Sequence, residues 1–258
     1  MFVRLGDVVI HAQQEGPADR PAVLLLHSLS ANLHMWDPQA AALARNWRVI
    51  RMDMRGHGIS TSVPGPYSMA QLAGDAFALL DELGVRQAHV GGVSIGGRIA
   101  LQMAAMAPQR VLSLMPCDTA LDFQPAGIWQ ERMNAAKANG LAAGADTTMG
   151  RWVLDQSLPS SQALRRMICS TDLQGWLGCA MALRDCRADE VLGRVNCPTT
   201  VVVGEKDPST PVAAARAVQA AIPGSRLVVI PEAAHIPNFE REAEMTAALL
   251  GHMEGQAA

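Results

Sequence analysis

The sequence is poor in the features that mark several classes of protein. It has a formal charge of −3 and no run of lysines and arginines, so it predicts no binding to nucleic acid and no attraction to an anionic membrane. No apolar run is long enough to cross a bilayer. The first residues, MFVRLGDVVIHAQQEG, lack the basic start, apolar middle and cleavage site of a signal peptide. We therefore expect a globular, cytoplasmic protein.

Cysteine is also scarce. An odd number of cysteines with no CxxC spacing favours reduced thiols over disulfides or a zinc site. Histidines and aspartates form no motif with the spacing of metal ligands. We therefore expect the protein to work without a metal. The five cysteines are Cys117, Cys169, Cys179, Cys186 and Cys197.

What the sequence does contain is an alternation of short apolar runs with helical segments. After a hairpin pattern over residues 3–11, six runs rich in Val, Leu and Ile have the length of buried parallel strands. The alternation predicts an α/β fold whose mostly parallel sheet is covered by helices on both faces. The expected strands are Ala22–Leu26, Arg48–Met52, Ala88–Val93, Val111–Met115, Thr199–Val203 and Arg226–Ile230, and the expected helices are Met35–Arg45, Met69–Leu83, Ile95–Ala107, Val212–Ala221 and Glu240–His252.

One segment interrupts this alternation. Residues 122–187 contain no good strand and are divided into helical pieces by prolines and glycines. We expect residues 1–121 and 188–258 to form the core domain and residues 122–187 to form a helical lid over the strand ends. Alanine-rich and methionine-rich stretches would suit either the core or a subunit interface, so a homo-oligomer is possible.

The stretch AHVGGVSIGGRIALQMA indicates a nucleophile. Its Gly92-x-Ser94-x-Gly96 motif lies where an expected strand meets an expected helix. In that setting a serine sits on a sharp turn with its hydroxyl above the sheet, and glycines avoid clashes with the neighbouring backbone. The helix N-terminus that follows favours negative charge on a reacting carbonyl. The motif therefore predicts Ser94 as the nucleophile of a serine hydrolase.

A serine nucleophile needs a base and an acid, and in this fold they follow it in the order acid, then histidine. His235, in PEAAHIPNFE, follows the last expected strand and is our choice of base, because His252 lies in a polar tail. Asp207, in VVVGEKDPSTP, is our choice of acid. Asp118, after the preceding strand, is the rival acid, and Glu205 is a minor candidate.

Two backbone N–H groups are expected to stabilise the oxyanion. One belongs to Ile95, which follows the nucleophile, and the other to Leu29, in the loop after the strand at residues 22–26. His27, in the same loop, precedes the serine in the chain, so we expect it to brace the loop. In MDMRGHGIS we expect Asp53 and Arg55 to pair and stabilise a loop rather than to form a second acid–base set.

Taken together, LLLHSLSANLHMWDPQ, RVIRMDMRGHGIS, VGGVSIGGRIALQMA, VVVGEKDPSTP and PEAAHIPNFE resemble the α/β-hydrolase family. Within it, His27-Ser28-Leu29 and the segment at residues 32–37 resemble the 3-oxoadipate enol-lactonases. The resemblance implies a triad of Ser94, Asp207 and His235, no cofactor, and attack on a lactone carbonyl. The chain departs from the common pattern at Gly-Val-Ser-Ile-Gly and at Pro-Cys-Asp-Thr-Ala, which leaves the substrate open.

An enol-lactone with an acetate side chain would bring one carboxylate into the site, so a cation or several donors should meet it. The candidates in the lid are Arg132 and Arg151, each beside a tryptophan, Trp129 or Trp152, that could form an apolar wall. Trp36, near the oxyanion loop, is a third candidate wall.

Other functions use the same residues. A general carboxylesterase or an acyl-homoserine lactonase would need the same triad, and broad activity on neutral esters would favour it. A ligand-sensing protein of this fold is a more remote alternative, because we find no segment suited to binding a partner. The expected ligand is therefore a small lactone or ester.

Overall fold

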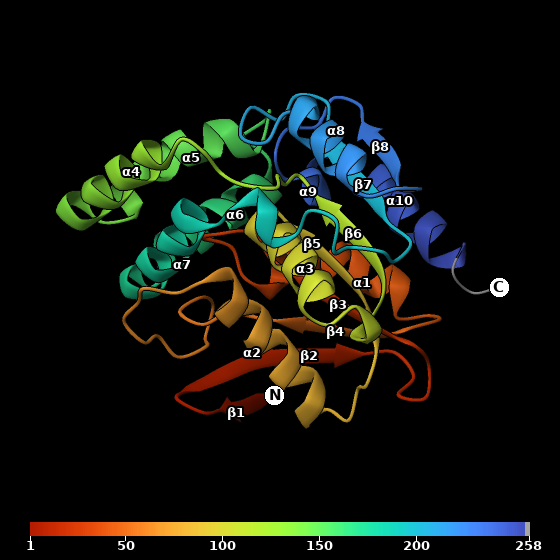
Figure 1. Ribbon diagram of the computed structural model, residues 1–258. Coiled ribbons are helices and arrows are strands. Elements are labelled where there is room, and N and C mark those ends of the chain that lie inside the picture. The colour runs from red at the N-terminus through yellow and green to blue at the C-terminus, as the bar shows by residue number, and fades with distance from the viewer. Residues whose placement is uncertain (256–258) are drawn as a thin grey trace.

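The computed structural model describes residues 1–255 and contains one eight-stranded sheet (Figure 1). The strand order is β1-β2-β4-β3-β5-β6-β7-β8. Strands β1 and β2 form an antiparallel hairpin that joins β4, and the remaining neighbours pair in parallel. The strands are β1 (Phe2–Leu5), β2 (Val8–Glu15), β3 (Ala22–Leu26), β4 (Arg48–Met52), β5 (Ala88–Val93), β6 (Val111–Cys117), β7 (Thr200–Gly204) and β8 (Arg226–Ile230).

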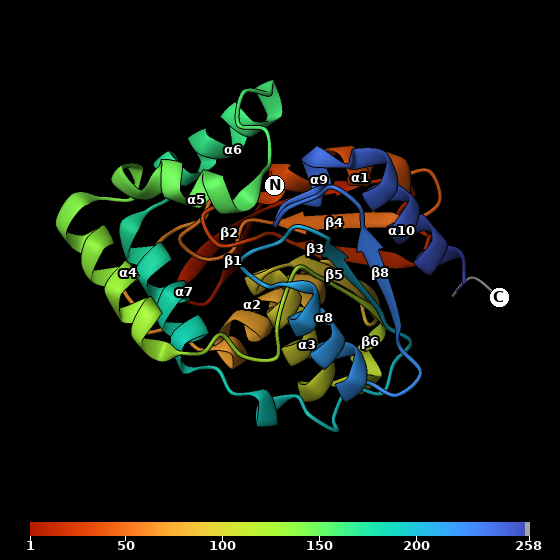
Figure 2. The ribbon, with the colours of Figure 1, turned by 90° about the horizontal axis from the view of Figure 1, so that it is seen from above.

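The central strands are buried on both faces, which explains why they read as continuous apolar runs. Helices α2 (Met69–Glu82), α3 (Ile95–Met106) and α8 (Val212–Ala221) cover one face, and α1 (Asp37–Leu43) and α10 (Glu242–Glu254) cover the other (Figure 2). The sheet therefore separates two apolar clusters, as predicted for an α/β fold.

Small differences from the sequence prediction lie at helix ends. The helix expected from Met35 begins as a 3₁₀ turn at Leu33–Trp36, and α1 follows it. The helix expected from Glu240 is divided into α9 (Pro237–Glu240) and α10. The 3₁₀ turn begins after the capping side chain of Asn32 and α9 begins at Pro237, and such local features set where a helix begins.

Between β6 and β7 the chain forms four helices, which lie together at one end of the molecule (Figures 1 and 2). They are α4 (Ala126–Asn139), α5 (Ala145–Trp152), α6 (Pro159–Ser170) and α7 (Leu173–Asp185). They occupy the segment at residues 122–187 for which we expect a lid. Its division from the core, and any opening or closing over the site, stays a prediction.

Helix α7 packs closely against the core through two of its glycines. A Cβ atom on Gly175 would lie 2.3 Å from the Cα atom of Gly56, and one on Gly178 would lie 2.4 Å from the ring of Tyr67. A larger residue would force two backbones apart at Gly175 and would displace the buried ring of Tyr67 at Gly178. Glycine at these positions therefore lets α7 pack directly against the rest of the molecule.

Within residues 1–255, no helix is both long enough and apolar enough to span a bilayer.

Candidate active site

Ser94 lies on a strained turn between β5 and α3. Its φ of 58° and ψ of −117° are unusual for a residue other than glycine. A Cβ atom on Gly92 would lie 2.3 Å from the carbonyl carbon of Gly96, and one on Gly96 would lie 2.4 Å from the carbonyl oxygen of Leu26. Only glycine fits at these two positions, as expected for a serine that is held above the end of a strand.

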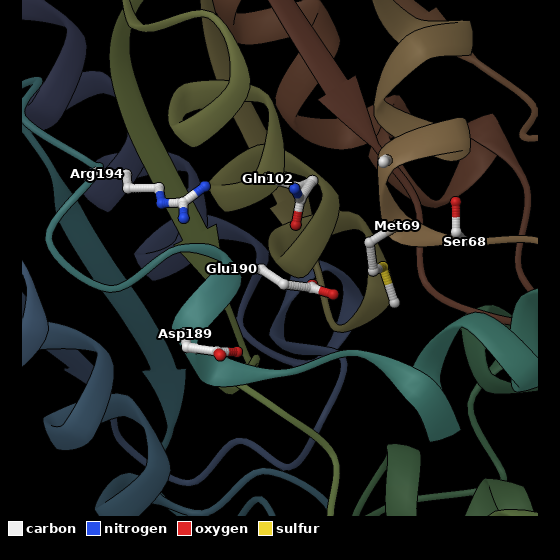
Figure 3. A pocket seen from close by; sticks show the side chains of 7 residues that line it. Ser68, Met69, Gln102, Asp189, Glu190 and Arg194 are labelled. Carbon is white, nitrogen blue, oxygen red and sulfur yellow. The ribbon is translucent and has the colours of Figure 1, made fainter.

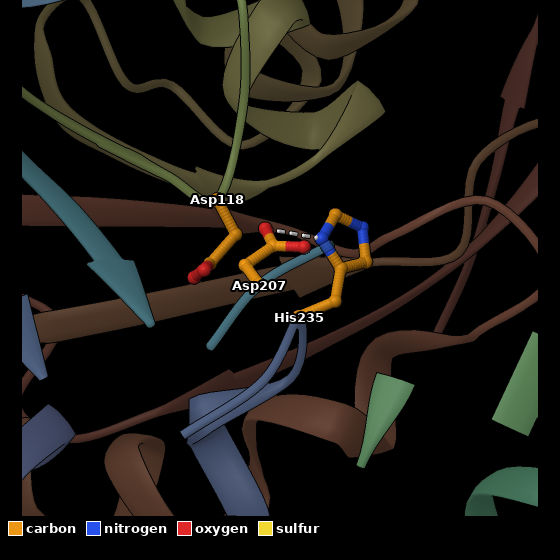
Figure 4. A group of neighbouring side chains, drawn as sticks. All are labelled: Asp118, Asp207 and His235. Carbon is orange, nitrogen blue, oxygen red and sulfur yellow. Dashed lines mark hydrogen bonds and ion pairs between the residues drawn. The ribbon is translucent and has the colours of Figure 1, made fainter. Parts of the chain in front are cut away.

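His235 and Asp207 are joined by a buried hydrogen bond. The distance from Nδ1 of His235 to Oδ2 of Asp207 is 2.8 Å (Figure 4). Because Nδ1 is used in this way, Nε2 is the nitrogen left to exchange protons with a substrate or a nucleophile. His235 follows β8 and Asp207 follows β7, so two parallel neighbouring strands bring them together.

The carboxylate of Asp207 is held by several donors. Its Oδ1 accepts from the backbone N–H groups of Ser209 at 2.7 Å and Thr210 at 3.2 Å, and its Oδ2 accepts from the hydroxyl of Thr210 at 2.6 Å. Burial alone would raise the pKa of Asp207, but the charge of His235 and these hydrogen bonds lower it to about 2. Asp207 is therefore ionised and fixed, as the acid of a triad must be.

The two rival acids lie elsewhere. Asp118 is fully buried after β6, and its Oδ1 accepts from the N–H of Gly204 at 2.8 Å rather than from His235. Glu205 is exposed, accepts from the N–H of Glu232 and pairs with the ammonium of Lys206. Of the three carboxylates considered, Asp207 is the one whose hydrogen bond to His235 the structure contains.

A cavity of about 500 Å³ lies between the strand ends and the helices α4–α7. Ser94 and His235 both line it, together with Leu29 from the loop after β3. Ile95 follows the serine as the first residue of α3, where N–H groups have no partner within the helix. The expected nucleophile, the expected base and one expected oxyanion donor, Leu29, thus line the cavity, and Ile95 is the next residue after Ser94. Their roles stay predictions.

Four of the five residues expected to bind substrate also line this cavity. Trp129 and Arg132 come from α4, and Arg151 and Trp152 from α5. The guanidinium of Arg132 lies over the ring of Trp129, 4.9 Å from its centre. Burial and the nearby charge of Arg151 lower the pKa of Arg132, and burial lowers that of Arg151, but both stay protonated at neutral pH.

The structure corrects two expectations. Trp36 is fully buried in the core and donates its indole N–H to the carbonyl of Leu26 at 3.1 Å, so it does not line the cavity. Arg55 pairs with Asp75 on α2 at 2.5 Å, not with Asp53. The position of Trp36 near the oxyanion loop in the sequence does not determine which way its side chain points. The partner of Arg55 lies 20 residues away along the chain, beyond the reach of a local motif.

His27 braces the same loop region, as expected. His27 accepts from the N–H of Met54 through Nε2 at 2.9 Å and donates through Nδ1 to the carbonyl of Ser28 at 2.7 Å. Burial lowers the pKa of His27, so it is a neutral structural group. Asp53 accepts from the backbone N–H of Leu33 at 2.8 Å and pairs with His11.

Sequence reasoning missed two polar contacts of the cavity wall. Trp176 on α7 donates its indole N–H to the hydroxyl of Ser30 at 2.8 Å, and both residues line the cavity. Nothing local in the sequence could indicate this contact, because it joins positions 146 residues apart. Thr210, which orients Asp207, could have been found from its position three residues after the aspartate, a common turn pattern.

Within residues 1–255, the acidic and histidine side chains close enough to hold a metal ion are Asp118, Asp207 and His235. The facing atoms of Asp207 and His235 already form a hydrogen bond with each other, as a triad requires.

A second pocket of about 260 Å³ lies between α2, α3 and the turn at Ala188–Glu190 (Figure 3). Its serine, Ser68, caps α2 by accepting from the N–H of Gln71 at 3.1 Å, so it is a structural residue.

Known proteins share this architecture. The family model described as alpha/beta hydrolase fold matches residues 21–135 and 129–242. The chain is 34% identical over 239 residues to 3-oxoadipate enol-lactonase 2 of Acinetobacter baylyi, covering 91% of this chain and 89% of that protein. The enol-lactonase structure from Burkholderia xenovorans LB400 has a TM-score of 0.95 and 29% identity, covering 98% of this chain and 100% of that one. A thermophilic esterase from Thermogutta terrifontis, solved with malate bound, has a TM-score of 0.91 and 28% identity, covering 97% and 95%.

Proposed function

Because the chain belongs to the α/β-hydrolase family and is a carboxylic ester hydrolase, we propose that its substrate is a small lactone bearing a carboxylate, namely 3-oxoadipate enol-lactone. We propose Ser94 as nucleophile, His235 as general base and acid, and Asp207 as the residue that orients His235. The observation that carries the substrate assignment is that two arginines share one cavity with Ser94 and His235.

The charge of this cavity supports an anionic substrate. Within residues 1–255, neither Arg132 nor Arg151 forms a salt bridge with a carboxylate. Two partly buried guanidinium groups without counterions are costly unless an anion completes the site. The relatives named enol-lactonases and the esterase solved with malate, a dicarboxylate, agree with this assignment.

The first half of the reaction forms an acyl-enzyme. Nε2 of His235 takes the hydroxyl proton as Oγ of Ser94 attacks the lactone carbonyl, and Asp207 stabilises the imidazolium. The N–H groups of Ile95 and Leu29 bind the oxyanion of the tetrahedral intermediate. When this intermediate collapses, the ring C–O bond breaks and the enol oxygen takes the proton back from His235. The enol then tautomerises to a ketone.

The second half releases the product. A water molecule gives its proton to His235 and attacks the acyl carbonyl, and Ser94 leaves with the proton that His235 returns. The free product is a 3-oxo acid with a new carboxylate. We expect α3 to favour both steps, because an oxyanion formed next to Ser94 would lie near the N-terminus of this helix.

The test compares steady-state hydrolysis of 3-oxoadipate enol-lactone, a neutral lactone and p-nitrophenyl acetate, with EDTA present. We expect kcat/KM for the enol-lactone to exceed that for the neutral lactone by at least about 100-fold, the value of a charge-assisted contact. We expect Ser94→Ala to lower all three activities by about 10⁵-fold or more with unchanged thermal melting.

The possible outcomes separate the two parts of the proposal. Equal or faster hydrolysis of the neutral substrates would move the assignment to a general carboxylesterase and leave the triad in place. Full activity of a pure Ser94→Ala protein would overturn the triad itself.

A further inference from the structure

Asp118 is a fully buried carboxyl group that the proposed mechanism does not use. It follows β6 directly, and its backbone N–H donates to the carbonyl of Val202 on β7 at 2.9 Å. Its φ of 43° lies in the left-handed region, which is unfavourable for an aspartate in a strand ending. The backbone is thus held in a strained state that places this side chain beside the end of β7.

The hydrogen bonds around the two neighbouring carboxyl groups are unequal. Asp207 has four donors for its two oxygens, from Ser209, His235 and twice from Thr210. Asp118 has the N–H of Gly204 on Oδ1, and no donor within residues 1–255 reaches its Oδ2. An ionised carboxylate would leave that oxygen charged, buried and without a partner, at a cost of several kcal/mol.

The charges around Asp118 also favour its neutral form. One oxygen of Asp118 lies within 4.8 Å of a carboxylate oxygen of Asp207 and of a ring nitrogen of His235 (Figure 4). Burial, the negative charge of Asp207 and a side-chain hydrogen bond with it raise the pKa of Asp118 well above its usual value. Glu240, at the end of α9, adds a smaller effect in the same direction, and Cys117, next to Asp118, has a raised pKa and is neutral.

We propose that Asp118 is a protonated carboxylic acid whose Oδ2–H donates to the carboxylate of Asp207, making Asp118 a positioning residue for the proposed triad. Two buried carboxyl groups at this separation share one negative charge, and Asp207 carries it because it has the better donors. A hydrogen bond from Asp118 both fixes the rotamer of Asp207 and withdraws charge from it. Asp118 thereby limits how strongly Asp207 stabilises the protonated form of His235.

The direct test is infrared spectroscopy of the whole protein at neutral pH. Ordinary carboxyl groups are ionised at neutral pH, so they would not contribute to the C=O stretching band that a protonated carboxylic acid gives. We expect such a band in the wild type and its loss in Asp118→Asn. Absence of the band from the folded wild type would overturn the proposal. This measurement needs no turnover, so it is independent of the proposed function on which the kinetic test rests.

The kinetic test compares Asp118→Asn with Asp118→Ala, with thermal melting as the check of folding. The amide can accept from Gly204 and donate to Asp207, so we expect Asp118→Asn to keep kcat/KM within about threefold and the acid limb of the pH–rate profile in place. Asp118→Ala removes the donor, so the acid limb should move to higher pH by about half a unit and kcat/KM should fall about tenfold.

Two results would contradict the positioning role. Movement of the acid limb to lower pH in Asp118→Asn would mean that the wild-type group is ionised, because the substitution would then have removed a negative charge. An unmoved acid limb in Asp118→Ala would show that Asp118 does not influence His235 through Asp207 and serves only to accept the hydrogen bond from the N–H of Gly204.

Discussion

Glycines at the strand ends around Ser94 and glycines in or beside the outer helices α4 and α5 differ in the space available for a Cβ atom. A Cβ atom on Gly92, Gly96 or Gly204 would lie 2.1–2.4 Å from another backbone atom. On Gly127 or Gly144, in or beside the outer helices, it would meet nothing within 4 Å. These three glycines of the strand ends, the tight wall, accept no added atom, whereas the two exposed glycines of the outer helices, the loose wall, have open space for a Cβ.

We infer from this difference that the two walls have different roles. The proposed reaction would require a serine, two N–H groups and a histidine at fixed positions, and close-packed strand ends can provide them. Recognition of a substrate requires side chains of suitable charge and size, which the cavity-lining positions of α4 and α5 can present in many combinations. We therefore expect the type of reaction to depend on the sheet and the choice of substrate to depend on α4 and α5.

Substitution of a glycine in the tight wall is expected to have the largest effect. In Gly96→Ala the new Cβ would press on the carbonyl oxygen of Leu26 and push α3 away from β3. We expect a loss of about 3 kcal/mol or more in unfolding free energy and a fall of at least about 100-fold in kcat. Urea unfolding and steady-state kinetics would measure both, and a fully active, normally stable variant would contradict the packing argument.

Removal of an arginine from the loose wall should change the choice of substrate more than the reaction. In Arg151→Ala or Arg132→Ala, we expect kcat/KM to fall by about 10- to 100-fold for carboxylated substrates and less than about threefold for p-nitrophenyl acetate. Arg165→Ala is the matched control, because Arg165 on α6 is exposed and pairs with Asp146. Equal losses on both substrate types would show that these arginines do not bind the carboxylate.

Acidification should weaken the sheet rather than the outer helices. Burial lowers the pKa values of His89 on β5 and His252 on α10 to about 4, and both bond to the hydroxyl of Ser113. Between the unfolded value of about 6.5 and these folded values, the unfolded chain binds more protons, so stability falls as the pH falls. The expected loss at pH 5 is on the order of 2 kcal/mol for one such histidine.

Urea unfolding of His252→Gln and of the wild type, at pH 7 and pH 5, would measure this contribution. We expect the loss on acidification to be smaller in His252→Gln. The control is His34→Gln, since His34 is exposed and pairs with Asp37. The same loss in all three proteins would place the acid sensitivity elsewhere.

The smallest expected effect is a gain in stability. Gly127 is exposed in the first turn of α4 and has open space where a Cβ would lie. Gly127→Ala should stabilise the protein by about 0.5 kcal/mol, because alanine loses less backbone entropy on folding. Its melting temperature should rise slightly while all kinetic constants stay unchanged. A fall in stability would mean that the outer wall is packed more tightly than the contacts of Gly127 indicate.

The sequence alone was sufficient for the sheet and for the pairing of Asp207 with His235. Buried parallel strands are apolar on both faces, so their runs stand out, and the predicted strands at residues 22–26, 48–52 and 88–93 match β3, β4 and β5 residue for residue. The glycine pattern around Ser94 likewise reflects local backbone geometry. Strands and tight turns can be predicted because they depend on residues that are close together in the sequence.

Contacts between distant segments could not be obtained in this way. The burial of Trp36, the Arg55–Asp75 pair and the contact of Trp176 with Ser30 depend on how helices lie against the sheet. The sequence placed Arg132 and Arg151 in two different helices, but only the folded chain shows that they line the same cavity.

The proposed triad draws its members from β5, β7 and β8, and this has a consequence for how the protein is made. Ser94 and His235 lie far apart in the chain, and β8 joins the sheet only through β7. Such non-local pairings form slowly, after long loops have closed. With the proposed triad, a chain emerging from the ribosome would hydrolyse an ester only after β8 has docked. Appearance of activity during refolding should coincide with completion of the sheet, which makes turnover a sensitive probe of the final folding step.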